Sequence, residues 1–357
     1  MEHNLNNNEA GINSNNYGSV SQYSKFYSQL QSQKGMLSDT VRTSCYCRSI
    51  TPNHFLDKVV MDVGTGSGIL AMFSAKAGAK KVYGIEFSSC ANYAKKLIES
   101  NNLQNKIEII NKKIEDIKEN EIEKVDIIVS EPLGVLLVNE RMLESFLIAR
   151  NRFLKPEGIM NPSKATMFFL PFTDQALYEN NINQVSFFNE TNFFGIDMSS
   201  LYSDALNEKM SKVVVGPYSS QCHVSNIPIA KTFDFQKIKI EELLNFSIYL
   251  EFIINFPCLI HGLASWFDAE LYNNIILSTS PNNPITHWYQ TRLLFKVPLA
   301  VNQGQKIKGV ITFKANNEQS YDIYLKLGIE GTEYFAENNY LLKDYELYGF
   351  DNFGNKA

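Results

Sequence analysis

Several features that would assign the chain to a familiar class are missing from its 357 residues. Its five cysteines are an odd number without a C-x-x-C pair, which fits neither a disulfide framework nor a zinc site, so we expect reduced thiols and no metal. The first residues lack a basic segment followed by an apolar one, so no secretory signal is expected. The most apolar later stretch, residues 243–260, contains Asn245, Glu251, Asn255 and Pro257, and does not read as a membrane span. We therefore expect a protein of the nucleus and cytoplasm that does not bind membranes.

Concentrated positive charge is also absent. The formal net charge is -5, and the 33 lysines and arginines are scattered, so the sequence has no basic patch of the kind that binds nucleic acids. No direct nucleic-acid binding is expected, and a mildly acidic protein suits basic partners. The length is sufficient for two packed domains, each with its own core.

The composition and the hydrophobic pattern of the sequence change along the chain. Residues 1–20 are rich in Asn and Ser with almost nothing apolar to bury, which predicts a disordered tail, and residues 21–50 carry helical spacings. Residues 51–160 alternate short β-branched runs with helical ones, which predicts a parallel sheet covered on both faces. Residues 161–357 contain Phe- and Tyr-rich runs typical of antiparallel strands, with a helical segment exposing aromatics at about 173–206.

A glycine-rich loop, V-V-M-D-V-G-T-G-S-G-I-L, lies between an apolar strand and a helix. It contains Gly64, Gly66 and Gly68, and such a turn allows a ligand to approach the backbone. The next strand ends at Glu86, where a carboxylate can accept both hydroxyls of a ribose. A G-x-G alone would indicate only a turn, but loop, strand, helix and acid together predict a site for a nucleotide-like cofactor.

The spacing within this loop favours one cofactor over another. The dinucleotide fingerprint requires glycine at its sixth position, where this chain has Ile69. The form G-x-G-x-G preceded by Asp62 is typical of methyltransferases, so S-adenosyl-L-methionine is favoured over NAD. Arg42 is a fitting partner for the carboxylate of that cofactor.

Two glutamates, Glu131 and Glu140, belong to the segment S-E-P-L-G-V-L-L-V-N-E at the end of the fourth predicted strand. Pro132 and Gly134 prevent a continued strand or a simple helix, so we expect a hairpin-like loop that turns both acids toward one cleft. A guanidinium, whose pKa lies above about 12, would relieve their repulsion. Two carboxylates that hold it can concentrate positive charge on some nitrogens and leave electron density on the nitrogen that attacks a methyl group.

Plainer interpretations of the segment remain open. Glu140 could simply cap the helix that starts near Asn139, and Glu131 could be a solvated strand end. A nucleic-acid amino-methyltransferase would show an Asn- or Asp-containing Pro-Pro-aromatic motif here. Ser-Glu-Pro-Leu is not that motif.

Taken together, these motifs resemble those of the type I protein arginine methyltransferases, and among them the coactivator-associated group. The resemblance covers nearly the whole chain after the first twenty residues. It rests on Y-S-K-F-Y, M-L-S-D-T-V-R-T, the glycine loop, the two-glutamate hairpin, E-R-M-L-E-S, L-I-H-G-L-A-S-W-F-D, T-H-W-Y-Q and Q-S-Y-D-I. The two-glutamate hairpin and T-H-W-Y-Q are highly specific in combination.

The resemblance implies a Rossmann-like cofactor domain, an antiparallel β-barrel domain with an inserted helical arm, and a homodimer formed through that arm. It implies S-adenosyl-L-homocysteine as the product of the cofactor. Residues implied to contact the cofactor are Tyr27, Gln33, Met36, Arg42, Asp62, Gly64, Gly66, Gly68, Glu86, Glu115 and Ser145. His287, Trp288 and Asn139 would join the glutamates around the substrate arginine, and His287 would pair with Asp39 as a proton route. From the sequence alone, His287 could equally be a half-buried histidine of the barrel.

Two departures from the family pattern stand out. The hairpin carries Leu133, Gly134 and Val135 where Met-Gly-Tyr is usual, which predicts a difference in substrate choice or in the degree of methylation. Tyr23 is followed by Ser24 where the family has a Tyr-Phe pair, which predicts weaker cofactor binding.

The sequence therefore supports one main hypothesis and two others. The main hypothesis is an enzyme that produces monomethyl and asymmetric dimethyl arginine on histone tails and RNA-binding proteins. A second is a catalytically weak dimeric scaffold that binds basic protein tails. A third is methylation of a small metabolite, against which the paired glutamates and the β-rich second half argue.

Overall fold

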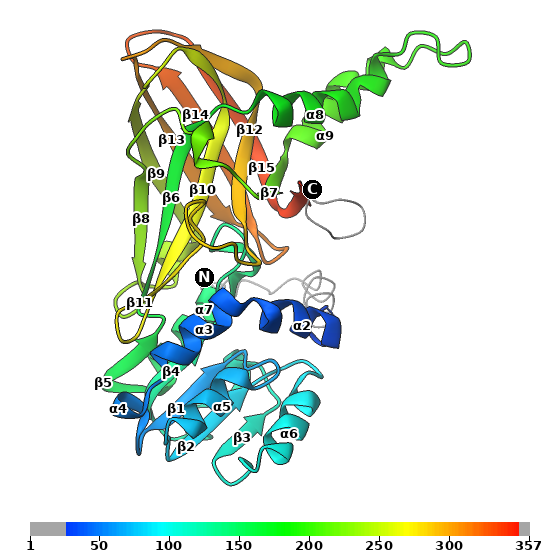
Figure 1. The fold of residues 1–357 in the computed structure, drawn as a ribbon. Coiled ribbons are helices and arrows are strands. Elements are labelled where there is room, and N and C mark those ends of the chain that lie inside the picture. Colours follow the sequence, from blue (N-terminus) through cyan, green and yellow to red (C-terminus); the bar gives the residue numbers. More distant parts are fainter. Residues whose placement is uncertain (1–25, 350–357) are drawn as a thin grey trace, which may run out of the picture.

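The structure is a computed structural model that describes residues 26–349 (Figure 1). The tail predicted for residues 1–20, and the pair Tyr23 and Ser24, lie outside the described residues. The described chain forms a parallel sheet with its helices, a larger antiparallel sheet and a projecting helical arm. This arrangement confirms the predicted fold class.

Helices α2 (Leu30–Ser38), α3 (Thr40–Ser49) and α4 (Pro52–Phe55) precede the first strand; α2 and α3 lie between the two sheets, and α4 lies at the edge of the parallel sheet (Figure 1). Helix α3 begins after Asp39, whose carboxylate accepts a hydrogen bond from the Arg42 amide and so satisfies one free donor of the first turn. Tyr46 anchors α3, because its ring is fully buried and its hydroxyl donates to the Ser130 carbonyl at 2.9 Å.

The first sheet is entirely parallel, with the strand order β3-β2-β1-β4-β5. All five residues of β1 are buried, as expected of a strand covered on both faces. Since strand order reverses direction beside β1, the carboxyl ends of β1 and β4 flank a crevice of the kind in which α/β folds bind ligands. The elements are β1 (Val59–Val63), α5 (Ile69–Lys76), β2 (Lys81–Ile85), α6 (Ala91–Ser100), β3 (Ile107–Ile110), η2 (Ile114–Asp116), β4 (Val125–Ser130), η3 (Asn139–Arg141), α7 (Met142–Phe153) and β5 (Leu154–Asn161).

The second sheet has ten strands in the described chain and curls into a nearly closed barrel. Its order is β8-β6-β10-β12-β7-β15-β14-β13-β9, with β11 paired to β10; only the β15–β7 pair is parallel. Strand β9 alternates exposed and buried residues, which places Phe246 inside, stacked on Phe313 at 4.7 Å. The elements are β6 (Lys164–Phe172), β7 (Lys212–Gly216), η6 (Ser220–Cys222), β8 (Ile229–Asp234), α10 (Glu241–Leu244), β9 (Asn245–Ile253), β10 (Cys258–Leu271), β11 (Ile275–Ser278), β12 (Gln290–Val301), β13 (Lys306–Ala315), β14 (Tyr321–Ile329) and β15 (Phe335–Leu347).

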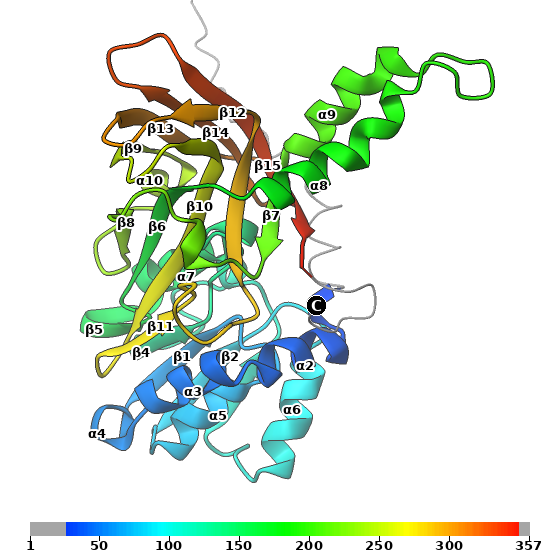
Figure 2. The ribbon, with the colours of Figure 1, turned by 45° about the horizontal axis from the view of Figure 1, so that its top comes forward.

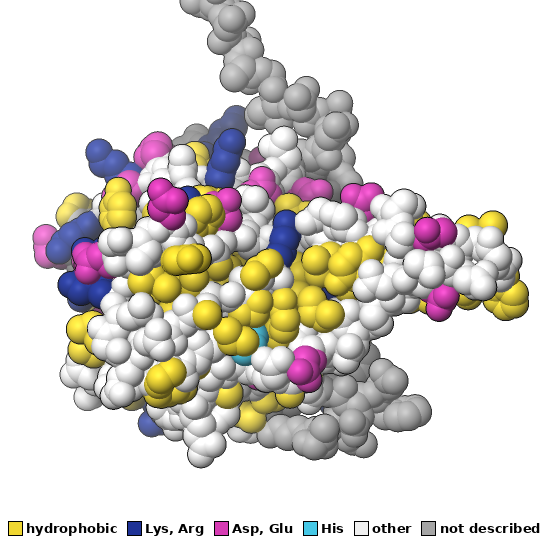
Figure 3. All heavy atoms as spheres, turned by 90° about the horizontal axis from the view of Figure 1, so that it is seen from above, with side chains coloured by type: hydrophobic (Ala, Val, Ile, Leu, Met, Phe, Trp, Pro, Cys, Tyr) yellow, Lys and Arg dark blue, Asp and Glu magenta, His cyan; other side chains and the backbone are white. Residues whose placement is uncertain are grey.

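A helical arm leaves the barrel between β6 and β7 and extends away from both sheets (Figures 1 and 2). It consists of α8 (Gln175–Val185), η4 (Ser186–Asn189), η5 (Ser199–Leu201) and α9 (Tyr202–Met210). Its far end exposes Phe187, Phe193, Phe194 and Ile196, and Phe194 is 92% exposed. Figure 3 shows apolar side chains at this end and again where the arm meets the barrel.

Within residues 26–349, none of the helices combines the length and apolar character that crossing a bilayer requires. In the same part of the chain, no His, Cys, Asp and Glu side chains are grouped in a way that could hold a metal ion.

Candidate functional site

A cavity of about 1290 Å³ lies between the carboxyl ends of the parallel strands and the barrel. Its walls come from three parts of the chain: the N-terminal helices, the loops that follow β1, β2 and β4, and the barrel loops. It therefore brings together residues from nearly the whole described sequence. Predicted site residues that line it are Tyr27, Gln33, Met36, Arg42, Gly64, Gly66, Glu86, Glu115, Glu131, Glu140, Ser145, His287 and Trp288.

The glycine loop forms one wall with its backbone. Gly64, Gly66 and Gly68 all have positive φ, at 69°, 54° and 83°, a conformation that glycine adopts without steric cost. A side chain on Gly66 would also meet Gln33, whose Oε1 lies 3.1 Å from the position of such a Cβ. The loop thus presents bare backbone to the cavity.

Asp62 supports this loop from behind and does not line the cavity. Its Oδ2 accepts hydrogen bonds from the Thr65 hydroxyl and from the Ala71 amide at 2.9 Å. Burial raises the pKa of the Asp62 carboxyl to about 7, although these two hydrogen bonds oppose the shift. The structure therefore gives Asp62 a supporting position and not the ligand contact that the family pattern implied.

The donor and acceptor groups around the cavity suit S-adenosylmethionine. Glu86 is 7% exposed and fixed by amide hydrogen bonds from Gly66 at 3.0 Å and Ser88 at 2.7 Å, so its carboxylate is positioned for ribose hydroxyls. Glu115 and Ser145 are joined at 2.6 Å on another part of the wall, where polar groups of an adenine could bind. The bare glycine backbone leaves room for the methionine portion.

The two-glutamate segment forms a tight hairpin after β4. The Gly134 amide donates to the Leu137 carbonyl at 2.9 Å, and a Cβ on Gly134 would lie only 2.2 Å from the Asn139 carbonyl oxygen. Glu140 itself has a φ of 71°, an uncommon conformation for a residue other than glycine. This hairpin brings the side chains of Glu131 and Glu140 to one cavity.

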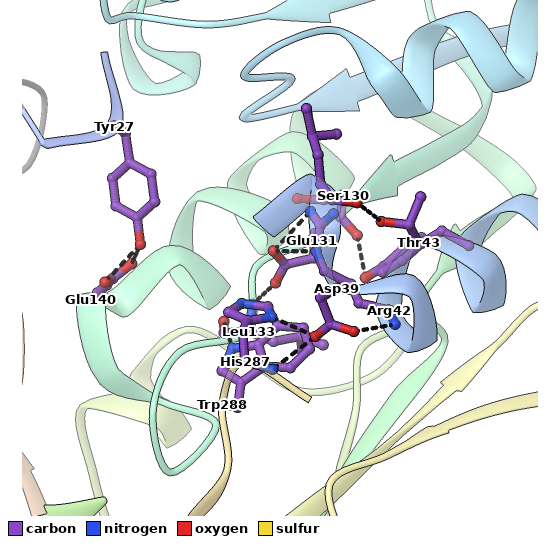
Figure 4. Close-up of polar contacts among 12 residues, drawn as sticks. Tyr27, Asp39, Arg42, Thr43, Ser130, Glu131, Leu133, Glu140, His287 and Trp288 are labelled. Atoms are coloured by element: carbon purple, nitrogen blue, oxygen red, sulfur yellow. Dashed lines mark hydrogen bonds and ion pairs between the residues drawn. The ribbon is translucent and has the colours of Figure 1, made fainter. Parts of the chain in front are cut away.

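Each glutamate is bound by a donor from the N-terminal segment (Figure 4). Arg42 donates from Nε and Nη2 to Glu131 Oε2 at 3.2 and 3.1 Å, and Tyr27 donates its hydroxyl to both Glu140 oxygens at 2.9 Å. Burial raises the pKa of the Glu140 carboxyl to about 7; the Tyr27 hydrogen bond opposes this shift and the charge of Glu131 adds to it. Tyr27 and Arg42, which the resemblance assigns to the cofactor, line the cavity together with the glycine loop and also contact the glutamates; their contact with the cofactor stays a prediction.

The barrel contributes His287 and Trp288 to the same cavity. Asp39 Oδ2 accepts hydrogen bonds from the His287 amide at 2.8 Å and interacts with its Nδ1 at 2.7 Å, which is the predicted pairing. Trp288 donates Nε1–H to the Leu133 carbonyl at 2.8 Å and so attaches the barrel loop to the two-glutamate hairpin (Figure 4).

Asn139 lies apart from the cavity, unlike its expected place beside the substrate. Its side chain is 3% exposed, and its Oδ1 accepts a hydrogen bond from the Ser320 hydroxyl at 2.7 Å. Asn139 is therefore another tie between the hairpin and the second sheet.

Several lining residues were not predicted from the sequence. They lie on the barrel side and near the start of α7: Met142, Glu144, Tyr289, Asn317, Gln319 and Tyr345. Four of these residues lie in motifs on which the resemblance rests, and those motifs were the signal that could have indicated them: Met142 and Glu144 in E-R-M-L-E-S, Tyr289 in T-H-W-Y-Q and Gln319 in Q-S-Y-D-I. In the sequence, nothing distinguishes Tyr345 from the many other aromatic residues of the second half of the chain.

Comparisons with known proteins define first a class and then a family. Residues 48–163 match the family described as ribosomal protein L11 methyltransferase, which places the parallel sheet among methyltransferase domains. Residues 163–332 match the family described as the arginine methyltransferase oligomerization subdomain.

Individual relatives agree with these matches. The histone-arginine methyltransferase CARMER of Drosophila erecta is 44% identical over 331 residues, covering 91% of this chain and 62% of the relative. A Trypanosoma brucei PRMT1 enzyme–prozyme complex with AdoHcy is similar at 32% identity and a TM-score of 0.77, covering 88% of this chain and 99% of that one. Arabidopsis thaliana protein arginine methyltransferase 10 is similar at 30% identity and a TM-score of 0.78; the match covers 89% of this chain and 99% of that one.

The chain therefore belongs to the protein arginine methyltransferase family. It spans 62% of the length of the curated CARMER relative.

Replacing Asp39 by alanine tests how firmly the N-terminal helices are attached to the barrel. Asp39→Ala should lower the free energy of unfolding by about 1–2 kcal/mol, the usual cost of a lost helix cap, measured by urea titration at pH 7. Burial alone would raise the pKa of Asp39, but hydrogen bonds from His287 and from the Arg42 amide lower it on balance. The stabilisation is therefore complete above about pH 4 and is lost as the pH falls through the lowered pKa.

The exposed Asp344 provides the control, since Asp344→Ala removes the same charge from the surface of β15. An Asp39→Ala protein as stable as the Asp344→Ala protein would contradict the anchoring role.

Proposed function

We propose that the protein transfers the methyl group of S-adenosylmethionine to a guanidinium nitrogen of arginine in other proteins, releasing S-adenosylhomocysteine. The observation that carries this proposal is the placement of Glu131 and Glu140 in one cavity with the bare glycine loop. Membership in the arginine methyltransferase family supports it independently.

In the proposed reaction, the cofactor supplies a methyl group on a sulfonium, which a nitrogen lone pair can attack. Glu131 and Glu140 bind the guanidinium through hydrogen bonds and concentrate its positive charge away from the attacking nitrogen. The walls of the cavity would fix the direction of that nitrogen toward the methyl group. His287, held by Asp39 at 2.7 Å, is the group proposed to accept the proton that the product nitrogen loses.

The finer assignment is type I activity, which gives monomethyl and asymmetric dimethyl arginine. The proposed substrates are arginine-containing basic tails of histones and RNA-binding proteins, in the nucleus and cytoplasm. The name histone-arginine methyltransferase carried by the Drosophila relatives supports histones. The net charge of -5 supports basic partners.

A catalytically weak scaffold is the second candidate. It is favoured by Leu133 and Val135, which line the cavity where the family has a thioether and an aromatic ring. Mass spectrometry of arginine peptides incubated with the protein and labelled S-adenosylmethionine separates the two candidates. Asymmetric dimethylarginine supports the type I enzyme, whereas bound cofactor without methylarginine supports the scaffold.

Removing either carboxylate charge should abolish the proposed chemistry. Glu131→Gln and Glu140→Gln keep the side-chain shape but lose the charge that holds the guanidinium, so kcat/KM for an arginine peptide should fall about 100-fold or more. Glu108→Gln, on the exposed edge of the parallel sheet, is the matched control and should retain activity. Undiminished methylation in both cavity variants would refute the proposed mechanism.

The raised pKa of Glu140 predicts a pH dependence. Below about pH 7 this carboxyl is increasingly protonated, and a neutral acid does not attract a guanidinium. kcat/KM for the peptide should therefore fall up to tenfold per pH unit below about 7 and level off above it. In Glu140→Gln, peptide binding measured by calorimetry should lose this dependence; a flat wild-type profile between pH 6 and 8 would contradict the assignment.

We further propose that two copies associate through the arm to form a homodimer. Its tip exposes apolar side chains far from the rest of the molecule, and the matched family is described as an oligomerization subdomain. A second copy is the partner that the family match supports.

Introducing a charged residue at the tip of the arm tests this association. Phe194→Asp should weaken dimerisation about tenfold or more, because Phe194 is 92% exposed at the tip and a buried carboxylate would oppose contact. Tyr249→Asp, 83% exposed on the barrel, is the control and should remain dimeric in sedimentation velocity. Equal dissociation constants for the two variants would exclude the arm tip from the interface.

A further inference from the structure

The backbone at Glu140 is strained. Glu140 and Arg141 follow one another with φ values of 71° and 56°, a left-handed conformation that residues other than glycine adopt at a cost in free energy. Such a pair persists only where surrounding contacts hold it in place. Because Glu140 lines the cavity, the strain lies at a group that is proposed to bind the substrate guanidinium.

One turn of the barrel contacts the residues on both sides of Glu140. This turn, residues 316–320, joins β13 to β14. On one side, the Ser320 hydroxyl donates to Asn139 Oδ1 at 2.7 Å. On the other side, Arg141 Nη1 donates to the Asn316 carbonyl at 2.8 Å. The backbone of Glu140 is therefore held from both directions by one distant segment of the chain.

The 316–320 turn is itself fixed by Asn316. The Oδ1 atom of this residue accepts hydrogen bonds from the Glu318 amide at 3.0 Å and from the Ser320 amide at 3.1 Å. Its backbone amide donates to the Ser320 carbonyl at 2.9 Å, and its Nδ2 donates to Asp322 Oδ1 of β14 at 2.9 Å. A turn closed by its own hydrogen bonds is a firm support for the strained backbone of Glu140.

Arg141 is oriented toward this turn by Glu144. Arg141 Nε and Nη2 donate to the two carboxylate oxygens of Glu144 at 2.6 and 2.9 Å, which leaves Nη1 for the Asn316 carbonyl. The Arg141 and Glu144 side chains are 23% and 19% exposed, so solvent screens this pair only in part. A planar guanidinium makes these three directed hydrogen bonds at once, whereas the ammonium group of lysine does not reproduce their geometry.

From these contacts we infer that Arg141 is a positioning residue that holds the Glu140 carboxylate in the orientation in which it binds the substrate guanidinium. The 316–320 turn is the support to which Arg141 is attached. In this role Arg141 acts through the backbone of Glu140 and not by contact with the substrate. The inference rests on the proposed function, because it concerns the carboxylate that receives the arginine.

Steady-state kinetics with S-adenosylmethionine and a short arginine peptide test this role. Arg141→Lys keeps the charge but loses the fixed set of hydrogen bonds, so kcat should fall about tenfold or more, because attack on a methyl group depends on alignment. The KM for S-adenosylmethionine should keep its wild-type value, since the glycine loop and Glu86 are unchanged.

Arg150→Lys is the matched control for this substitution. Arg150 lies near the other end of α7, and its Nη1 also donates to a backbone carbonyl, that of Phe235 next to β8, at 2.6 Å. The control therefore removes a comparable contact between α7 and the second half of the chain without touching the neighbours of Glu140. It should keep the wild-type kcat.

A double-mutant cycle shows whether Arg141 acts through Glu140. In calorimetry with the peptide and saturating S-adenosylhomocysteine, Arg141→Lys should weaken peptide binding about threefold or more when Glu140 is present. In the Glu140→Gln background the same substitution should have no further effect, because the carboxylate that Arg141 orients is gone. An equal loss of affinity in both backgrounds would overturn the inference.

The outcomes separate this inference from the proposed function. If the wild-type protein methylates the peptide and Arg141→Lys has the kcat of Arg150→Lys, only the inference fails. If the wild-type protein neither binds nor methylates arginine peptides, the proposed function fails and the inference fails with it. Should Arg141→Lys not fold, Glu144→Gln weakens the orientation of the same guanidinium and should lower kcat; full activity in Glu144→Gln would then refute the positioning role.

Discussion

The mutual repulsion of two carboxylates in one buried cavity is the constraint on which the rest of the site depends. Glu131 and Glu140 line the same cavity, and the N-terminal segment supplies a donor to each, Arg42 to Glu131 and Tyr27 to Glu140. Burial is the main cause of the raised pKa of Glu140, the Tyr27 hydrogen bond lowers it, and the charge of Glu131 adds to the rise. A site that is short of positive charge is well suited to a guanidinium, which brings charge and several donors together.

The barrel holds the two-glutamate hairpin in place. Trp288 binds the Leu133 carbonyl and Ser320 binds Asn139, so both arms of the hairpin are attached to the second sheet. Asp39 connects the helix that carries Arg42 to the same barrel loop through His287. The geometry of the glutamates is therefore a property of the interface between the sheets and not of the hairpin alone.

Sequence reasoning succeeded where chemistry is local. The glycine loop, Glu86 and the turn at Gly134 are encoded within a few residues of a strand end, and alternation of strand and helix predicts the parallel sheet. It failed where a side chain's partner is distant in sequence. Nothing near Tyr27 or Arg42 in the sequence indicates their hydrogen bonds to Glu140 and Glu131, and nothing near Asn139 indicates its hydrogen bond with Ser320. Tyr345 lies in the last strand, β15, outside every motif quoted from the sequence, whereas Gln319 belongs to Q-S-Y-D-I, which did not by itself indicate a place in the cavity.

The cavity wall includes Tyr27 near the start of the described chain and Tyr345 near its end. Such a wall has a very high contact order, because its parts are separated by almost the whole length of the polypeptide. During synthesis, the cofactor loop and the glutamates leave the ribosome long before the last strand that completes their surroundings. A nascent chain therefore carries the chemical groups of the site before its walls are complete, and the cavity forms in full only when the C-terminal strand joins the barrel.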